Sequence, residues 1–531
     1  MVYAYSFTRD GQTFVTHVAG DSRSCEGLPS KMVEEMFRAG LGGYAIYAHN
    51  FRRFDSVFML GLAAQIKSQG RRADILLDST QRRVISLTVY PPASASTDGP
   101  IVFMDSRRIV SGSIENLASR YGTPLKGDFP HDTMDLAWLD DEASAPEHLR
   151  GGKLRGMVKA YNQRDVAILF KVISAVNKEL KTGIKSLVYH HVSASGIAMH
   201  YYMSEHMPTS RKLRLPTNKY LKDIGRFGYK GGLVQAPGRG KVYKKVYAYD
   251  VVSMYPSVML DCPMPSGQVV GIEQIRQSDY GFVHVVARAP KDKLPCLLPI
   301  TRAIKNGPVA DESRPKLECV RHEELFSGIF LTSEVKAAID YGYRVAAYGG
   351  IKFTPHTGAF KSYVLQCFKL RQERRARGDR AGEQLYKELL NSLYGRLAMR
   401  GSFPRHQFLT RSELRALEIK APHGTVSAQP LQGGNYLVTT QPREGNHYDR
   451  VCKMRGLPYT AYGELASSRR SAVQVAAAIT AHSRIVISKF KNIPENPIIY
   501  SHTDSVVVEH ELTDPSLVGE NELGKLKFLG V

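Results

Sequence analysis

The chain has 531 residues, of which 43% are hydrophobic and 23% are charged. This composition is typical of a soluble globular protein and excludes disordered and fibrous classes, and at about 150 residues per domain the length predicts three or four compact units. Seventy-two Lys and Arg against 50 Asp and Glu leave a net charge of +22, which favours a polyanionic partner, nucleic acid ahead of a membrane surface; a merely basic enzyme is the alternative.

The cysteine and hydropathy patterns exclude further classes. The six cysteines include no CxxC pair, which argues against a zinc site or a disulfide framework and favours a reducing compartment. The longest apolar stretch, near 57–66, is far shorter than the roughly 18 residues that a membrane span needs. No secretory signal is visible at the amino terminus, so we expect a soluble chain without a membrane partner.

The first part of the chain alternates predicted strands and helices. Residues 44–50 are strand-like, and a helix with a continuous apolar face is expected to end near Leu180. The polar segment 181–186 is the first predicted boundary. Gly40, Gly42 and Ala45 match a GxGxxA dinucleotide fingerprint, but that motif must follow a strand and open a helix, whereas here a helix precedes it, so we reject it.

A glycine-rich stretch at 229–241 begins the second part of the chain. After it we expect a strand at 245–252, a small α/β insert at 262–355 and helices across 361–399 that are broken at Gly378. A second, looser insert at 401–455, a long helix at 465–490 and a strand-turn-strand at 498–508 are predicted to follow.

Two carboxylates stand at the ends of predicted strands. Asp250 ends an apolar strand, and Asp504 lies at or just after the turn of a hairpin. Each has an ordinary explanation, as a capping or a turn residue. Two strand ends that each present one carboxylate could also hold a pair of Mg²⁺ ions about 3.5–4 Å apart, although spacing alone does not show that the two meet.

A predicted helical hairpin carries cations. Arg371 and Arg375 are four residues apart and share a face, as do Lys387, Asn391 and Tyr394. Folding back at Gly378 would bring three cations onto one surface suited to a triphosphate, and the alternative is a solvated basic helix.

In combination these elements resemble one enzyme family. The motifs DxxSMYPS (250–257), KxxxNSLYG (387–395) and YxHTDS (500–505) occur in the order found in the family B DNA polymerases. YKGG (229–232) resembles the YxGG sequence of the protein-primed subgroup, found in phages, viruses and mitochondrial linear plasmids. The resemblance spans nearly the whole chain.

The resemblance implies a role for each motif residue. Asp250, Asp504 and Val251 would hold two Mg²⁺ ions, for which Mn²⁺ can substitute. Tyr255 would lie under the sugar and exclude a ribonucleotide 2′-OH. The nucleotide would be bound by Arg371, Arg375 and Lys387 at the triphosphate and by Asn391 and Tyr394 at the base pair, and DNA by Tyr229, Gly231, Gly232 and Thr503.

The amino-terminal region resembles the proofreading domain of the same family. HNFRRFD (49–55) matches its second exonuclease motif, with Asn50 and Asp55. YNQRD (161–165) matches the third, in which Tyr161 would orient a water and Asp165 would bind metal. Capping and surface roles are the alternatives for these residues.

The chain departs from the family pattern at three points. The first exonuclease motif, a DxE pair, is absent, which predicts feeble proofreading. His502 stands where the family has the first Asp of DTDS, and this weakens the negative field that attracts Mg²⁺. The sequence stops before the family's KxY motif and thumb, so we expect either a fragment of a longer reading frame or a decayed copy.

The resemblance implies an α/β multidomain fold. An RNase H-like 3′-5′ exonuclease domain would precede a right-hand palm and short helical fingers, with two inserts and an incomplete or absent thumb. The predicted domains are an exonuclease-like domain (1–183), the YxGG linker and start of the palm (184–261), an insertion (262–355), fingers (356–400), a second insertion (401–455) and the rest of the palm (456–531).

The predicted activity is DNA-directed DNA polymerisation by a monomer. Its expected partners are primer-template DNA, dNTPs and a terminal priming protein, in mitochondria if the gene lies on a linear plasmid and otherwise in a virus or its host cell. A catalytically inactive relative that only binds DNA is the second hypothesis, and a nuclease that uses the first 180 residues is the third.

Overall fold

The computed structural model describes most of the chain in two compact units. The described residues are 4–19, 27–53, 55–68, 71–77, 84–92, 99–124, 129, 135, 137–186, 188, 191–207, 219–274, 276, 278–304, 311–399, 405–420, 426–431, 434–440 and 472–531. The first unit comprises Met1–Ile197, Leu370–Tyr386 and Phe403–Arg443, and the second comprises Ala198–Lys369, Lys387–Ser402 and Glu444–Val531. None of the helices within the described ranges combines the length and apolar character needed to span a membrane.

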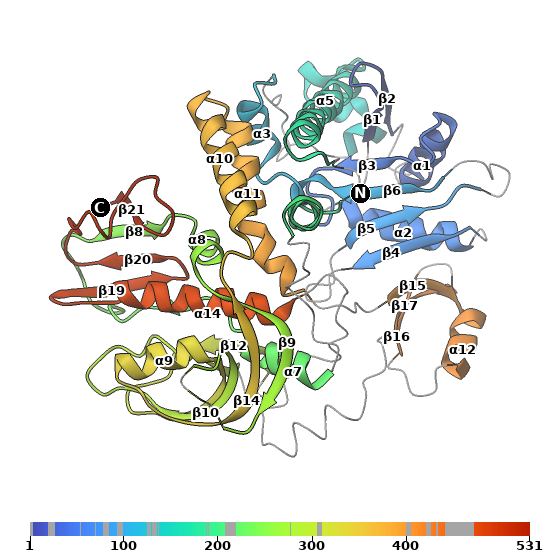
Figure 1. Cartoon of the computed structure of the whole chain (residues 1–531). Helices are drawn as coiled ribbons and strands as arrows, with labels where there is room; N and C mark the ends of the chain where they lie inside the picture. Colours follow the sequence, from blue (N-terminus) through green and yellow to red (C-terminus); the bar gives the residue numbers. More distant parts are fainter. Residues whose placement is uncertain are drawn as a thin grey trace. The chain divides into compact units, whose positions relative to one another are not determined.

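The first unit is built on a seven-stranded mixed sheet (Figure 1). Its strand order is β16-β17-β15-β4-β5-β6-β3, and β3 and β6 run parallel. The strands are β3 (Ala45–Ala48), β4 (Ala73–Leu77), β5 (Val84–Val89), β6 (Ile101–Asp105), β15 (Arg405–Thr410), β16 (Val426–Pro430) and β17 (Asn435–Thr440). Buried residues of β5 and β6, among them Leu87, Val89 and Ile101, lie in one hydrophobic core.

The segment predicted as a second, looser insert contributes strands to this sheet. β15 pairs with β4, where His406 lies opposite Ile75. The buried Asn435 amide donates a hydrogen bond to the Ala64 carbonyl at 3.1 Å. The described part of 401–455 therefore belongs to the amino-terminal unit, and the rest of that insert lies outside the described residues.

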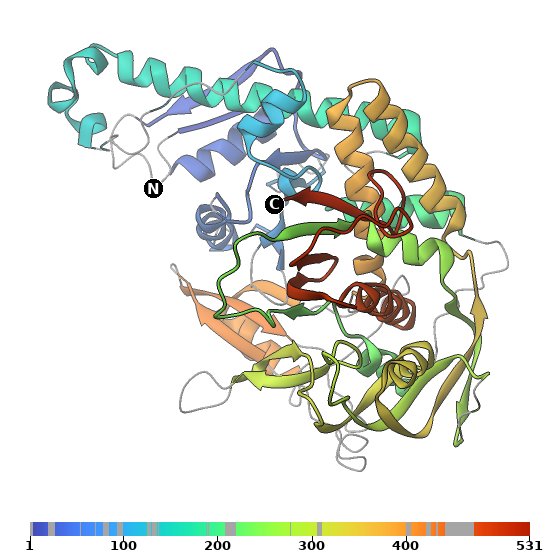
Figure 2. The ribbon, with the colours of Figure 1, turned by 90° about the vertical axis from the view of Figure 1, so that its left-hand side faces the viewer.

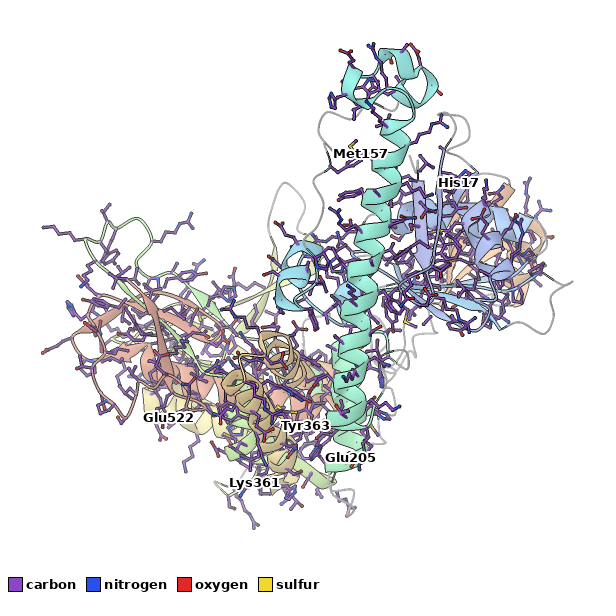
Figure 3. All side chains as sticks on the ribbon, turned by 90° about the horizontal axis from the view of Figure 1, so that it is seen from above. His17, Met157, Glu205, Lys361, Tyr363 and Glu522 are labelled. Carbon is purple, nitrogen blue, oxygen red and sulfur yellow. The ribbon has the colours of Figure 1, made fainter. Side chains whose placement is uncertain are left out.

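Helices and a hairpin complete the first unit. They are β1 (Ala4–Thr8), β2 (Phe14–Val18), α1 (Leu28–Arg38), α2 (Asp55–Ser68), α3 (Ile114–Arg120), α4 (Ala137–Asp140), α5 (Lys153–Ile184) and α12 (Arg411–Lys420). Helix α6 (Ala194–Tyr201) begins in this unit and passes into the second at Ala198. Figure 3 shows α5 as one continuous helix that carries Met157 toward its N-terminal end. It continues past Leu180 to Ile184, so the predicted boundary at 181–186 is largely helical and not a linker. The GxGxxA match lies between α1 and β3, as expected for a chance match.

The second unit contains a six-stranded sheet that carries both predicted metal ligands. Figure 2 shows the red C-terminal strands of this sheet beside a green strand from the middle of the chain. Its strands are β7 (Val234–Gln235), β8 (Tyr247–Val251), β18 (Asn492–Ile493), β19 (Asn496–His502), β20 (Ser505–Val508) and β21 (Leu526–Gly530). The path is β18-β19-β20-β8-β21, with β7 paired to β19. Tyr249, Val251 and Val506 pack in one core with Ile487 of α14 (Val473–Phe490).

The predicted insert at 262–355 forms an antiparallel sheet of order β13-β10-β14-β9 and a two-stranded ribbon of β11 and β12. Its elements are β9 (Met264–Ile272), β10 (Gly281–Arg288), β11 (Ile300–Ile304), β12 (Asp311–Glu318), β13 (Leu325–Leu331), α9 (Thr332–Tyr341) and β14 (Arg344–His356). Two helices precede it in the chain, α7 (Lys219–Gly228) and α8 (Met254–Asp261). β10 and α9 agree with the α/β character predicted for this insert.

The predicted helical hairpin consists of α10 (Lys361–Ala376) and α11 (Arg380–Leu397). Gly378 between them has φ +69°, a conformation that favours glycine. The long helix predicted over 465–490 is seen as α14 from Val473, and residues 465–471 lie outside the described residues.

Candidate active site

Asp250 and Asp504 lie on neighbouring strands of the second unit. β8 pairs antiparallel with β20 so that Asp250 is opposite Ser505, the residue that follows Asp504. The backbone N–H of Val251 donates to the carbonyl oxygen of Asp504 at 2.8 Å. The fold thus brings together two carboxylates that are 254 residues apart in the sequence.

The two carboxylates perturb one another. Burial and then the charge of Asp504 raise the pKa of Asp250 to about 6, although the charge of Lys387 opposes both effects. Burial also raises the pKa of Asp504, while its own backbone N–H and then the nearby His502 lower it. Half-buried carboxylates that repel one another fit a divalent cation, since Mg²⁺ prefers oxygen ligands and neutralises both charges. Among the described residues, no group of three or more His, Cys, Asp or Glu side chains is placed to hold a metal, so this site would rely on the pair.

The turn that carries Asp504 rests against the YKGG segment. The backbone N–H of Thr503 donates to the Leu233 carbonyl at 2.9 Å. A Cβ atom on Gly232 would lie 2.6 Å from Thr503 Cγ2, so only glycine permits this close approach. Thr503 has φ +57° and Ser253, just after Val251, has φ +48°. Positive φ angles at non-glycine residues near both carboxylates indicate local backbone strain, which is common at functional sites.

Three of the predicted site residues form a tyrosine cluster. The rings of Tyr255 on α8 and Tyr394 on α11 stack with centroids 4.0 Å apart. Burial raises the pKa of Tyr229 in the YKGG segment, and the neighbouring Tyr394 raises it further. Because Lys387 and Asn391 precede Tyr394 by seven and three residues on α11, they share its side of the helix.

Arg371 and Arg375 contact a carboxylate that the sequence analysis missed. Glu383 Oε1 lies 3.6 Å from Arg371 Nε and 2.6 Å from Arg375 Nη2. The sequence signal for Glu383 was its position four residues before Lys387, the spacing of a helical ion pair. Both arginines of the predicted triphosphate site thus face an acid, while the charge of Lys387 acts on Asp250.

The exonuclease-like residues lie on several elements of the first unit. Asn50 has φ +62° and its side-chain carbonyl accepts a hydrogen bond from Arg107 Nη1 at 3.2 Å. Asp55 begins α2, and burial followed by the charge of Asp105 raises its pKa. Asp105 ends β6 with 2% of its surface exposed, and was missed although a carboxylate at a strand end was the signal used for Asp250.

The third exonuclease-like motif lies on α5. Tyr161 and Asp165 are four residues apart and therefore share a face of this helix, as predicted. The Tyr161 ring packs against Phe129 with centroids 4.8 Å apart. No DxE pair precedes the HNFRRFD motif (49–55) in this sequence.

Comparison with known proteins identifies the family. The family model described as DNA polymerase type B, organellar and viral, matches residues 42–496. A protein of Agaricus bitorquis named "Probable DNA polymerase" is 26% identical over 99% of this chain and 68% of its own length. One of Neurospora intermedia with the same name is 24% identical over 92% of this chain and 50% of its own. The chain thus spans 68% and 50% of the length of these two relatives.

A phage enzyme and solved structures agree with this assignment. The "DNA-directed DNA polymerase" of Enterobacteria phage PRD1 is 27% identical over 55% of this chain and 45% of its own length. Phi29 DNA polymerase complexed with primer-template DNA superposes with a TM-score of 0.67, at 16% identity, over 99% of this chain and 80% of that chain. This likeness confirms the predicted multidomain α/β polymerase fold. The chain belongs to the organellar and viral type B DNA polymerases.

Proposed function

We propose that this chain is a DNA-directed DNA polymerase that adds deoxynucleotides to a primer 3′-OH with two bound Mg²⁺ ions. The observation that supports this most directly is the pairing of β8 with β20, which sets Asp250 beside Asp504. The pKa values of both carboxylates are raised, as is common at functional sites, and a bound cation would stabilise their ionised forms.

The carboxylates of Asp250 and Asp504 and the carbonyl of Val251 would hold the ions. When bound, the ions activate the primer hydroxyl and stabilise the pyrophosphate leaving group. Lys387, whose charge already acts on Asp250, would bind the triphosphate. The stacked rings of Tyr255 and Tyr394 would support the incoming sugar and base, and a rigid ring under the sugar would exclude a 2′-OH. The assignment of Arg371 and Arg375 to the triphosphate stays a prediction.

The proposed process is protein-primed replication of a linear DNA element. It is supported by the YKGG segment, whose Gly232 packs directly on Thr503 of the turn formed by Thr503 and Asp504, called here the catalytic turn. The proposed partners are primer-template DNA, dNTPs and a terminal priming protein, with the polymerase as a monomer. The proposed compartment is the mitochondrion for a plasmid-encoded chain, or a virus or its host cell otherwise.

The amino-terminal unit is proposed to be a weak exonuclease at most. Asp55 and Asp105 provide two carboxylates close enough to influence one another. Asp105, however, already accepts hydrogen bonds from the backbone N–H groups of Arg52 and Arg107, at 3.2 and 2.9 Å. Because no DxE pair precedes HNFRRFD (49–55) in this sequence, few ligands remain for efficient two-metal hydrolysis.

Primer extension on a primed single-stranded template tests the polymerase proposal. The wild-type chain should extend the primer with dNTPs and Mg²⁺ or Mn²⁺, and Asp250→Ala and Asp504→Ala should each abolish extension. Asp514→Ala is the matched control, because Asp514 accepts a hydrogen bond from the Ser516 N–H in an exposed turn of the same unit. Extension that persists in both site variants would contradict the assignment.

His502 supports a second candidate function, that of an inactive DNA-binding relative. An imidazole at this position is exposed and adjoins Asp504, where the family has a carboxylate. This candidate predicts no metal-dependent turnover but salt-dependent DNA binding, with log K falling in proportion to the phosphates contacted. Binding without extension by the wild-type chain would favour it.

A further inference from the structure

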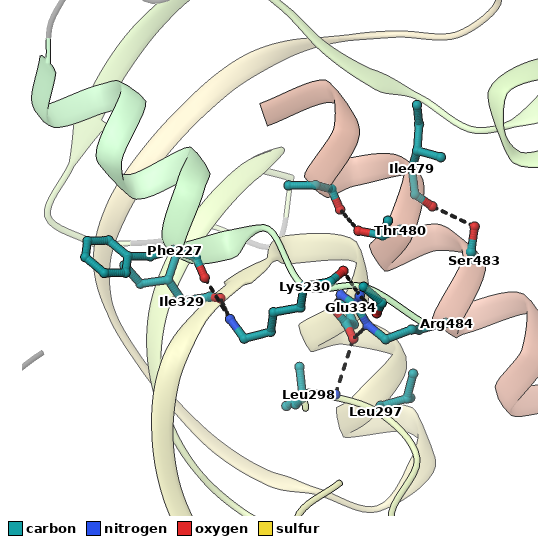
Figure 4. A network of polar contacts seen from close by, with 12 residues as sticks. Phe227, Lys230, Leu297, Leu298, Ile329, Glu334, Ile479, Thr480, Ser483 and Arg484 are labelled. Carbon is teal, nitrogen blue, oxygen red and sulfur yellow. Dashed lines mark hydrogen bonds and ion pairs between the residues drawn. The ribbon is translucent and has the colours of Figure 1, made fainter. Parts of the chain in front are cut away.

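A buried ion pair joins two helices of the second unit that are distant in sequence (Figure 4). Arg484 on α14 donates from Nε and Nη2 to the two carboxylate oxygens of Glu334 on α9, both at 2.7 Å. Their side chains are 1% and 0% exposed. The Glu334 carboxylate also accepts a hydrogen bond from the Leu298 N–H at 3.3 Å. Such bidentate pairs are geometrically demanding, because the planar guanidinium fits only one orientation of the carboxylate.

The remaining donor of Arg484 is directed at the YKGG main chain. Arg484 Nη1 donates to the carbonyl oxygens of Lys230 and Gly231, at 2.6 and 2.9 Å. The side chain of Lys230 is buried as well, and its Nζ donates to the carbonyls of Phe227 and Ile329, at 2.8 and 2.9 Å. The backbone and the side chain of Lys230 are therefore held by different elements (Figure 4).

The segment held in this way is the one that supports the catalytic turn. Directly after Gly231, Gly232 packs on Thr503 and the Leu233 carbonyl accepts the Thr503 N–H. β7 then continues the contact, with Val234 opposite His502. Any shift of the YKGG main chain would therefore be transmitted to the turn that presents Asp504.

The energetics of buried ion pairs favour a positioning role over a stabilising one. The free-energy cost of removing two charges from water offsets much of their mutual attraction. Well-packed apolar side chains of similar volume can therefore often replace such pairs without loss of stability. An apolar pair could fill this space, but it could not bind two carbonyl groups of a glycine-rich loop. The hydrogen bonds to Lys230 and Gly231 are thus what the ion pair contributes beyond packing.

We propose that the Glu334–Arg484 pair is a positioning device, in which Glu334 orients the guanidinium so that Arg484 fixes the YKGG main chain against the Thr503–Asp504 turn. The proposal deepens the proposed polymerase function and rests on it for its catalytic consequence. Its structural consequence, an ordered catalytic turn, does not depend on activity.

A set of variants distinguishes the positioning role of the ion pair from its contribution to stability. Glu334→Gln keeps the size of the side chain and Arg484→Lys keeps a cation of similar reach, but each removes the bidentate pair. Glu334→Met combined with Arg484→Met keeps the core packed and removes the bonds to the loop. Two controls remove neighbouring hydrogen bonds that do not reach the loop. Ser483→Ala deletes a bond to the Ile479 carbonyl on the same helix, and Tyr343→Phe deletes bonds to Leu297 in the adjacent core.

The first measurement is hydrogen exchange by mass spectrometry on the peptide that spans residues 499–508, below the melting temperature of every variant. The pair variants, including the double-Met variant, should exchange at least about tenfold faster than wild type in this peptide, because the Thr503 amide loses its fixed acceptor. The controls should exchange like wild type. Wild-type protection in a folded double-Met variant would overturn the proposal.

The second measurement is single-nucleotide incorporation by the same proteins. The pair variants should lose about tenfold or more in kcat and require more Mg²⁺, while affinity for primer-template DNA stays within about twofold. Unchanged kcat despite faster exchange would refute the catalytic consequence alone. An inactive wild type would refute the proposed function and leave the exchange result to decide on the positioning role.

Discussion

Replacing Asp250 with Asn should make the metal-free protein more stable while it abolishes nucleotide incorporation. The carboxylate of Asp250 is half-buried beside Asp504, and burial is the main cause of its raised pKa. Above that pKa the folded chain must hold two nearby negative charges without a cation. An Asn side chain has almost the same shape and removes one of these charges.

The magnitude follows from the pKa shift. A rise from 3.8 to about 6 is about two pKa units, and at 1.36 kcal/mol per unit it corresponds to about 3 kcal/mol of destabilisation by the ionised group. Because the group is only half-buried, solvent screening reduces this to about 1–2 kcal/mol. For a compact unit as large as the second one, this gain in stability amounts to a rise of a few degrees in melting temperature.

The pH dependence has a definite sign. Below about pH 4 the carboxyl is protonated in both folded and unfolded chains, and the substitution should have little effect. Between about pH 4 and 6 the unfolded carboxyl ionises first, so wild-type stability falls as pH rises while that of Asp250→Asn does not. Above about pH 7 the difference should be constant.

Thermal melting in EDTA from pH 4 to 8 measures this difference. Asp514→Asn is the control with the opposite expected sign, because its hydrogen bond with Ser516 lowers the pKa of Asp514. Adding Mg²⁺ should raise the melting temperature of wild type, since a ligand of the folded state stabilises it, and should raise that of Asp250→Asn less. A metal-free Asp250→Asn protein that melts below wild type at pH 7.5 would refute the reasoning.

Three further substitutions probe the same site. Gly232→Ala places a Cβ 2.6 Å from Thr503 Cγ2 and should reduce primer extension by about tenfold or more, with partial rescue by Thr503→Ala. Gly271→Ala on β9 is the control, because its Cβ would meet no atom within 4 Å, and it should extend like wild type. Tyr255→Val removes the ring stacked on Tyr394 and should increase ribonucleotide incorporation relative to deoxynucleotide incorporation, while Tyr255→Phe should not; equal discrimination by both variants would contradict the assigned role. His502→Asp adds a carboxylate beside Asp504, so it should lower the Mg²⁺ concentration needed for half-maximal extension and also lower the melting temperature in EDTA. An unchanged Mg²⁺ requirement would show that residue 502 does not contribute to the negative field that attracts the metal.

Much of the local structure was predictable from the sequence. Strand-like alternation identified β8 and the β19–β20 hairpin, and Gly378 marked the break between α10 and α11. The motifs around Asp250 and Asp504 led to the family before any pairing of strands was known. These features are local, since periodicity, turn chemistry and motif order all depend on residues that are close in the chain.

The tertiary structure alone decided how distant segments combine. Glu334 and Arg484 are 150 residues apart, and neither position has a sequence pattern that predicts a buried bidentate pair. The strands of 405–440 were predicted as part of a loose insert, yet β15 pairs with β4 of the first unit. Local periodicity shows which side of a strand is buried, but the partner strand and its register depend on packing across the whole unit. For that reason the sequence predicts the carboxylates and the family by itself, whereas the network that holds the catalytic turn in place is visible only in the folded chain.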